Sequence, residues 1–146
     1  MCHVSFMPSE KRPVFDIGLV PKLKALEGAF VSVGSGFEPL LYKNFDRLMH
    51  ELSDLGMHIQ LITNGTTLDQ SKVDTLLACN MNIINFSFDG IQKRTFEYIR
   101  RGADYVETLA NILNTKAAFK GRGTSFLINT TTMKSNLHES IEILDF

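Results

Sequence analysis

The residues of this chain that could do chemistry follow four short apolar stretches, each of which is predicted to be a β-strand. After residues 29–33 comes a glycine turn, Gly34-Ser35-Gly36, followed by the carboxylate of Glu38. Glycine lets a backbone turn sharply or approach a ligand closely. A polar loop also comes directly after each of the later apolar stretches: Thr63-Asn64-Gly65, Ser87-Phe88-Asp89-Gly90 and Asn129-Thr130-Thr131. Ligands bind where the carboxyl ends of parallel strands meet such turns, so these loops are predicted to form a binding site.

The elements that must position these loops alternate between strand and helix. Strands are predicted at residues 29–33, 57–63, 82–88 and 124–131. Helices are predicted at residues 16–28, 44–56 and 69–79, and from Asp104 and Asn136 onward. Such alternation is typical of a parallel sheet with helices packed outside it. Two architectures fit this order: an open doubly wound sheet, or an arc of a (β/α) barrel, which needs ~250 residues when it has eight units.

Apolar spacing also predicts which faces of the helices are buried. The stripes expected to face inward in the first, fourth and last helices are Leu19-Leu23-Leu26, Val106-Leu109-Leu113-Ala117 and Leu137-Ile141-Leu144. Two helix starts have the pattern of a capping box, in which the first and fourth residues bond each other's backbone N–H groups. These pairs are Asp104 with Glu107, and Asn136 with Glu139.

The composition limits the size of the domain and the kinds of partner, although it excludes few classes of function. The chain has 146 residues, 44% of them hydrophobic and 21% charged, which is ordinary for one globular domain or part of one. A net charge of −1 gives no support to a nucleic-acid or membrane-surface partner. No apolar run approaches the ~18 residues of a membrane span. Two cysteines do not make a disulfide framework, so a reducing, cytoplasmic setting is expected, with Cys79 as a buried structural thiol.

Each candidate residue also has a simpler interpretation. Glu38 could be a solvated loop acid, and Asn64-Gly65 could be ordinary turn chemistry. Asp89 could cap the segment that follows it. The cations Lys93, Arg94, Arg100 and Arg101 could form a solvated face. The four histidines lack metal-ligand spacing and are interpreted as structural or surface residues.

Taken together, the motifs resemble those of the radical SAM core domain. Gly36-Phe37-Glu38-Pro39 resembles the family's Gly-Gly-Glu-Pro, and residues 63–65 resemble its T-N-G. Residues 87–90 resemble its S-x-D-G, and residues 99–102 resemble its I-R-x-G. Asn136 and Glu139 resemble the N-x-x-E that opens its fifth helix. Met1-Cys2 resembles the end of its Cys-x3-Cys-x2-Cys motif.

The resemblance implies a fold, two cofactors and a reaction. The fold is a partial (β/α)6 barrel, here represented by four parallel strands with helices outside. The cofactors are S-adenosylmethionine and a [4Fe-4S] cluster held by three thiolates, which leave one iron open. The reaction is reductive cleavage of S-adenosylmethionine to a 5′-deoxyadenosyl radical that abstracts hydrogen from a substrate, here unknown. The electron comes from a donor such as flavodoxin or ferredoxin.

The resemblance also implies roles for particular residues. Cys2 is the expected cluster ligand. Backbone carbonyls at Gly36-Phe37 face the ammonium of S-adenosylmethionine, with Glu38 adding charge or bracing the turn. Ser87 and Arg100 suit the carboxylate and ribose, and Arg100 rather than Arg101 is expected to face the ligand. Asn129 or Thr131 could reach the ribose or the substrate. The remaining residues expected to line the cofactor site are Pro39, Asn64 and Asp89.

The pattern departs from the family's in its cysteines. Only Cys2 matches the cluster motif, so the sequence is expected to lack the first strand, the first two cluster cysteines and the last strand, and to be inactive alone. The rival interpretation is a non-catalytic α/β remnant that binds a nucleotide-like ligand.

We therefore expect the chain as given not to assemble a stable [4Fe-4S] cluster as a monomer, because one thiolate cannot replace three. Anaerobic reconstitution followed by iron analysis and absorbance spectroscopy measures this. A stoichiometric cluster on this chain would contradict the expectation.

Overall fold

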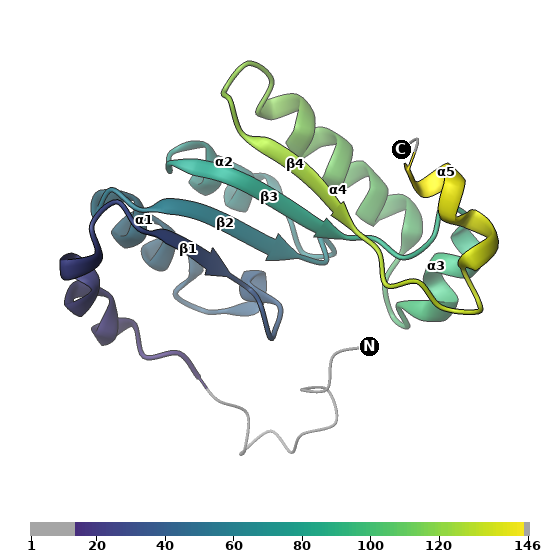
Figure 1. Ribbon diagram of the computed structural model, residues 1–146, viewed down its shortest axis with the longest axis horizontal. Helices are drawn as coiled ribbons and strands as arrows, with labels where there is room; N and C mark the ends of the chain where they lie inside the picture. Colours follow the sequence, from purple (N-terminus) through teal and green to yellow (C-terminus); the bar gives the residue numbers. More distant parts are fainter. Residues whose placement is uncertain (1–13, 145–146) are drawn as a thin grey trace.

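The computed structural model describes residues 14–144, and its centre is one parallel sheet. The strands are β1 (Phe30–Val33), β2 (His58–Thr63), β3 (Met81–Ser87) and β4 (Ser125–Asn129). They lie in the order β1-β2-β3-β4, and each pairs in parallel with the next (Figure 1). The prediction of four parallel strands without hairpins is confirmed, with bounds that differ by one or two residues.

The helices decide between the two architectures. They are η3 (Ile17–Leu26), η4 (Pro39–Leu41), α1 (Phe45–Asp54), α2 (Gln70–Leu77), α3 (Lys93–Ile99), α4 (Tyr105–Ala118), η5 (Leu137–Glu139) and α5 (Ser140–Leu144). In Figure 1, α1, α2 and α4 all lie behind the sheet. A doubly wound sheet reverses its strand order and carries helices on both faces. Sequential order with one covered face is the arrangement of a barrel arc.

The core lies between this sheet and its helices. Ile59 and Leu61 of β2 and Ile84 and Phe86 of β3 are fully buried, and they point to the helix-covered face. Burying such side chains contributes about 1.5–3 kcal/mol each. The alternate residues point to the other face, where Leu127 of β4 is 45% exposed. The sheet is therefore covered on one side only within residues 14–144.

The first helix buries a different face from the predicted one. Leu19 and Leu26 are exposed, whereas Val20 is buried and Ile17 and Leu23 pack partly against the core. The reason is the helix type: η3 is a 3-10 helix, with 3.0 residues per turn rather than 3.6. Residues three apart then share a face, which places Ile17 and Val20 with Leu23, the one residue of the predicted stripe that packs against the core. Leu26 has the same spacing but ends the helix and is exposed.

The buried face of α4 also differs from the predicted one, of which only Leu109 packs against the core. Val106 and Leu113 are 61% and 48% exposed, whereas Thr108, Ile112 and Thr115 are buried. Thr108 Oγ1 donates to the carbonyl of Asp104 at 2.6 Å, and Thr115 Oγ1 donates in the same way to the residue four before it at 2.7 Å. Their hydroxyls are thus satisfied within the helix, and the methyl groups can face the core.

The last helix shows a third difference. Leu137, Ile141 and Leu144 are 62%, 75% and 85% exposed, and Ile143 is the buried apolar residue of α5.

The predicted capping box at the start of α4 is confirmed in one half, since Asp104 Oδ1 accepts from Glu107 N at 2.9 Å. No helix within residues 14–144 is long and apolar enough to cross a membrane.

Cys79 follows α2 and is half-buried, with its Sγ atom 3.9 Å from His50 Nδ1. Burial, followed by the nearby carboxylates of Asp54 and Asp46, raises the pKa of its thiol from 9.0 to about 11. The thiolate is the nucleophile, so this thiol should be unreactive near neutral pH.

We expect iodoacetamide at pH 8 to alkylate Cys79 at least about tenfold more slowly in the folded protein than in urea, because unfolding restores an ordinary thiol pKa. Peptide mass spectrometry separates Cys79 from Cys2 and measures the rate at each. Equal rates at Cys79 in the two states would show that burial does not protect it.

Candidate functional site

The polar loops singled out in the sequence all lie at the carboxyl end of the sheet. Thr63, Ser87 and Asn129 are the last residues of β2, β3 and β4, and Gly34 follows the end of β1. Ser87 and Asn129 are direct partners in the register of β3 and β4. The prediction that these motifs gather at one end of a parallel sheet is confirmed.

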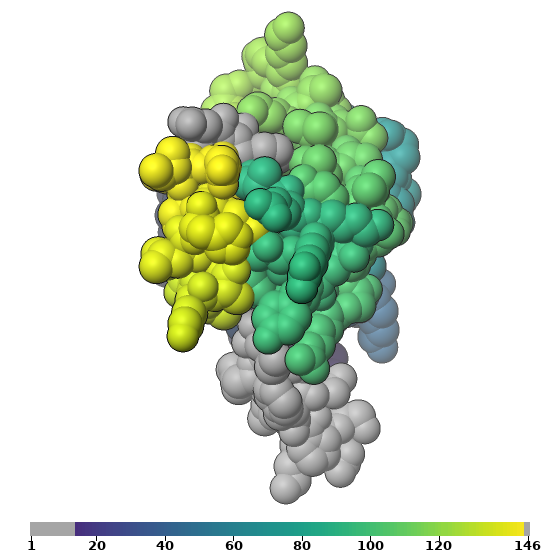
Figure 2. All heavy atoms as spheres, turned by 90° about the vertical axis from the view of Figure 1, so that its right-hand side faces the viewer, coloured from purple at the N-terminus to yellow at the C-terminus, as the bar shows by residue number. Residues whose placement is uncertain are grey.

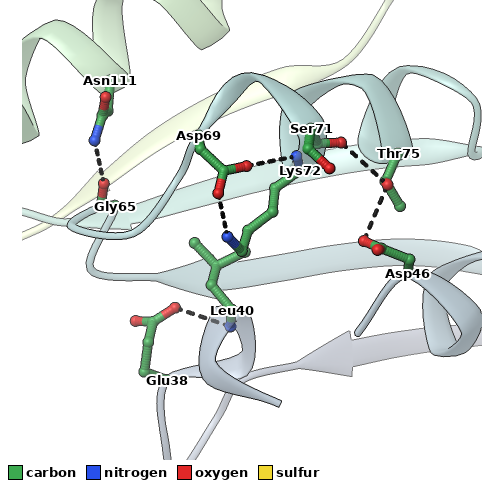
Figure 3. A network of polar contacts seen from close by, with 9 residues as sticks. All are labelled: Glu38, Leu40, Asp46, Gly65, Asp69, Ser71, Lys72, Thr75 and Asn111. Carbon is green, nitrogen blue, oxygen red and sulfur yellow. Dashed lines mark hydrogen bonds and ion pairs between the residues drawn. The ribbon is translucent and has the colours of Figure 1, made fainter. Parts of the chain in front are cut away.

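Glu38 joins the loop after β1 to the end of β2. Its Oε1 accepts from Thr63 Oγ1 at 2.6 Å and from Leu40 N at 3.2 Å, and its Oε2 accepts from Asn64 N at 2.8 Å. Figure 3 shows the carboxylate turned to the start of η4. The interpretation as a solvated loop acid is therefore wrong. Both oxygens are used within the protein, so Glu38 braces the turn.

Gly34 is the glycine of this turn that the packing requires. It has φ of 105°, and a Cβ atom on it would lie 2.1 Å from the backbone oxygen of Ile62. Any side chain there would push β1 away from β2. A Cβ at Gly36, by contrast, would have no heavy atom within 4 Å. Phe37 is half exposed and Pro39 is buried behind the turn.

Asn64 and Gly65 form a tight turn after β2. Asn64 Oδ1 accepts from Thr66 N at 2.9 Å and from Thr66 Oγ1 at 2.7 Å, and Gly65 has φ of 73°. Asn111 of α4 donates from Nδ2 to the Gly65 carbonyl at 3.0 Å (Figure 3). The side-chain oxygen of Asn64 thus makes the hydrogen bonds that are usual for an asparagine in a turn. A contact between Asn64 and a ligand stays a prediction.

Asp89 connects the loops after β3 and β4 to Arg100. It is 3% exposed; its Oδ1 accepts from Thr131 N at 2.8 Å, and its Oδ2 lies 2.7 Å from Arg100 Nη2. The interpretation of Asp89 as a cap for the following segment is wrong, because α3 begins after Gln92 and receives no cap from Asp89.

Arg100 differs from the other cations of its segment. Its side chain is 23% exposed, whereas Lys93, Arg94 and Arg101 are exposed, so only those three fit a solvated face. Its Nε atom is buried and has no hydrogen-bond partner within the described residues. A guanidinium has five N–H donors, so the pair between Nη2 and Asp89 leaves donors, Nε among them, for another group. The expected inward orientation of Arg100 relative to Arg101 agrees with this placement.

Ser87 and Asn129 lie side by side on the uncovered face of the sheet. Ser87 is half-buried, Asn129 is exposed, and neither side chain makes a hydrogen bond within residues 14–144. The backbone carbonyl of Asn129 accepts from Phe88 N at 2.9 Å. Thr131 contributes its backbone N–H to Asp89, and its side chain is exposed.

The predicted capping box at Asn136 and Glu139 does not form. Both residues are buried, at 1% and 0% exposure. Glu139 Oε2 instead accepts from Ile91 N at 2.7 Å and Gln92 N at 3.1 Å, at the start of α3. One signal in the sequence could have indicated this: Gln92, which precedes α3, is not among the residue types that cap a helix with their own side chain, and it makes no such bond.

Glu139 stays charged in this position. Burial acts to raise its pKa, but hydrogen bonds from the Thr95 hydroxyl and from two backbone N–H groups, together with nearby His138, hold the pKa below its ordinary value of 4.5. His138 Nε2 lies 3.3 Å from Glu139 Oε1.

The expected cluster ligand, Cys2, lies outside the described residues. Within residues 14–144 no group of three or more His, Cys, Asp or Glu side chains could hold a metal. Cys79 precedes β3 and lines an open cavity of about 480 Å³ at the amino end of the strands, with Met57 and Thr124. It is therefore at the opposite end of the sheet from the motifs.

Curated proteins with similar sequences carry the names of enzymes. The AdoMet-dependent heme synthase of Methanosarcina barkeri is 35% identical over 115 residues, which cover 77% of this chain and 31% of that protein. The GTP 3′,8-cyclase of Peptoclostridium acidaminophilum is 34% identical over 117 residues, covering 73% and 36%. The chain thus spans about a third of the length of these relatives.

Solved structures share the fold, and the family model shows the relationship. Streptococcus suis SuiB matches with a TM-score of 0.70 and 19% identity, over 88% of this chain and 28% of that one. SuiB bound to S-adenosylmethionine matches with a TM-score of 0.66 and 20% identity, over 80% and 26%. The model described as "Radical SAM superfamily" matches residues 19–146. The chain therefore belongs to the radical SAM superfamily, a family of enzymes.

Proposed function

We propose that this chain is the part of a radical SAM enzyme that binds S-adenosylmethionine at the carboxyl ends of β1 to β4. The observation that carries the proposal is Arg100. Its Nη2 pairs with buried Asp89, which fixes the guanidinium, while its Nε remains buried without a partner in the described part of the chain. A buried donor without an acceptor costs about 1–3 kcal/mol, which a bound carboxylate or hydroxyl oxygen would recover.

The other residues have roles that follow from their positions. The Ser87 hydroxyl, at the end of β3, is available to a ligand carboxylate or ribose, and Asn129 lies beside it for the ribose or the substrate. Backbone carbonyls of the Gly36-Phe37 turn face the ligand ammonium. Glu38 acts through that turn, since its carboxylate is already occupied by Leu40, Thr63 and Asn64.

A [4Fe-4S] cluster would supply the electron that cleaves the sulfonium, drawn from a reductant such as flavodoxin or ferredoxin. Cys2 would provide one of its three thiolates. Family membership supports the cluster, and the role of Cys2 is supported by the resemblance of Met1-Cys2 to the end of the cluster motif. The protein's own residues bind and orient S-adenosylmethionine and exclude water from it. A substrate is not assigned, because relatives of near-equal identity are named for heme synthesis and for cyclisation of GTP.

Replacement of Arg100 by Ala should weaken S-adenosylmethionine binding by about 1.5–3 kcal/mol, the scale of hydrogen bonds to a charged group, or roughly ten- to hundredfold. Arg101→Ala is the matched control and should stay within about 0.5 kcal/mol, as exposed substitutions do. Titration calorimetry on the whole protein that carries this chain, with its cluster reconstituted, measures both. Equal losses, or a larger loss at Arg101, would overturn the assignment.

Replacement of Glu38 by Ala should lower the free energy of unfolding by about 1–3 kcal/mol, because Asn64 N and Thr63 Oγ1 lose their buried acceptor. Glu38→Gln should lose less, since one carbonyl oxygen remains to accept. Urea unfolding followed by circular dichroism measures the change, and Glu27→Ala, at an exposed acid after η3, is the control. A stable Glu38→Ala protein that has lost ligand binding alone would mean that Glu38 contacts the ligand directly.

A further inference from the structure

The loops after β3 and β4 are tied together by buried polar side chains. Asn136 Nδ2 donates to the backbone carbonyls of Asp89 and Thr131, at 3.0 Å each, and its Oδ1 accepts from Met133 N at 2.7 Å. Glu139 Oε2 accepts hydrogen bonds from the backbone N–H groups of residues 91 and 92. Every bond that leaves Asn136 or Glu139 for the β3–α3 loop crosses about 47 or 48 positions of sequence.

These contacts lie where two segments meet. In Figure 2 the yellow segment of α5 lies beside the teal segment of α3, and Figure 1 shows the same neighbours. Gly90 lies close against α3 itself, because a Cβ atom on it would lie 2.9 Å from Phe96 N. Burying a carboxylate and an amide is unfavourable unless they are hydrogen-bonded. Apolar side chains could fill such a junction at no loss of stability, so a role of these polar groups in fixing geometry is the hypothesis to test.

The purpose that the geometry indicates is the placement of Arg100. Asp89 is fixed through its carbonyl by Asn136 and through its Oδ1 by Thr131 N, which directs Oδ2 to Arg100 Nη2. Glu139 fixes the start of α3, and Arg100 follows the end of the same helix, with its N–H bonded to Phe96 O at 2.8 Å. Asn136 and Glu139 therefore hold the start of the segment, at residues 89 to 92, and α3 connects that start to Arg100.

We propose that Glu139 and Asn136 are positioning residues, which hold the segment from Asp89 to Arg100 so that the guanidinium faces the bound ligand. This inference rests on the proposed function, in which Arg100 binds S-adenosylmethionine. Neither residue touches the ligand; each acts through Asp89 and α3. Glu139 needs an acceptor oxygen for this task, since both backbone N–H groups bond its Oε2 alone.

The test compares Glu139→Ala, Glu139→Gln and Glu142→Gln in the whole protein with its cluster reconstituted. Glu139→Ala should weaken S-adenosylmethionine binding about tenfold, the scale of coupling between contacting groups. Glu139→Gln keeps an oxygen that can accept both N–H groups and should restore most of the affinity. Glu142, an exposed acid on α5, is the matched control and should leave affinity unchanged. Calorimetry gives the affinities, and the thermal midpoint reports folding.

A double-mutant cycle separates positioning from stability. If Glu139 acts through Arg100, adding Glu139→Ala to Arg100→Ala should cause no further loss of affinity. Full additivity, or a Glu139→Ala protein with a lowered midpoint and unchanged affinity, would overturn the inference. Where Glu139→Ala does not fold, Asn136→Ala in the same cycle decides between these outcomes. An Arg100→Ala protein that binds normally would instead overturn the proposed role of Arg100.

Discussion

The end of a parallel sheet presents backbone N–H groups that the sheet itself cannot satisfy, and this constraint shapes the whole site. Glu38 accepts from Asn64 N, Asp89 from Thr131 N, and Glu139 from two N–H groups before α3. Each carboxylate thus ties its own loop to a loop from another strand. Without these acceptors the loops would have to take their hydrogen bonds from water, and the site would lose its shape.

Much of the fold could be predicted from the sequence because its signals are local. Alternating β-branched residues marked the strands, and glycine turns marked their ends, so the gathering of the motifs followed. The errors have physical causes. The hydroxyls of Thr108 and Thr115 donate to backbone carbonyls within α4, so these two polar residues can be buried. A prediction based on the spacing of apolar residues alone therefore missed the buried face. Asn136 and Glu139 fit a local capping pattern, but their partners lie more than forty residues earlier in the chain.

The acids of the motifs hold loops together, and for Glu38 this agrees with one of the two roles expected from the sequence, bracing the turn. Both oxygens of Glu38 and of Asp89 are occupied by protein groups. Within residues 14–144, the side chains at this end of the sheet that bond no other protein side chain or backbone group include the Ser87 hydroxyl and the Asn129 amide, and Arg100 has donors beyond the one that pairs with Asp89. In the proposed function these groups bind a carboxylate and a ribose.

Some side chains at this end of the sheet hold the loops together, and others are left to contact a ligand. Because the loops are held by bonds within the protein, they need little reordering when a ligand binds, and less binding free energy is lost to ordering them. The relatives named for heme synthesis and for GTP cyclisation match 77% and 73% of this chain at 35% and 34% identity, so enzymes with different names are similar to most of it. Side chains on the uncovered face of the sheet, such as Leu127 and Asn129, take no part in the hydrogen bonds that join the loops in the described part of the chain, so they can vary without disturbing those loops.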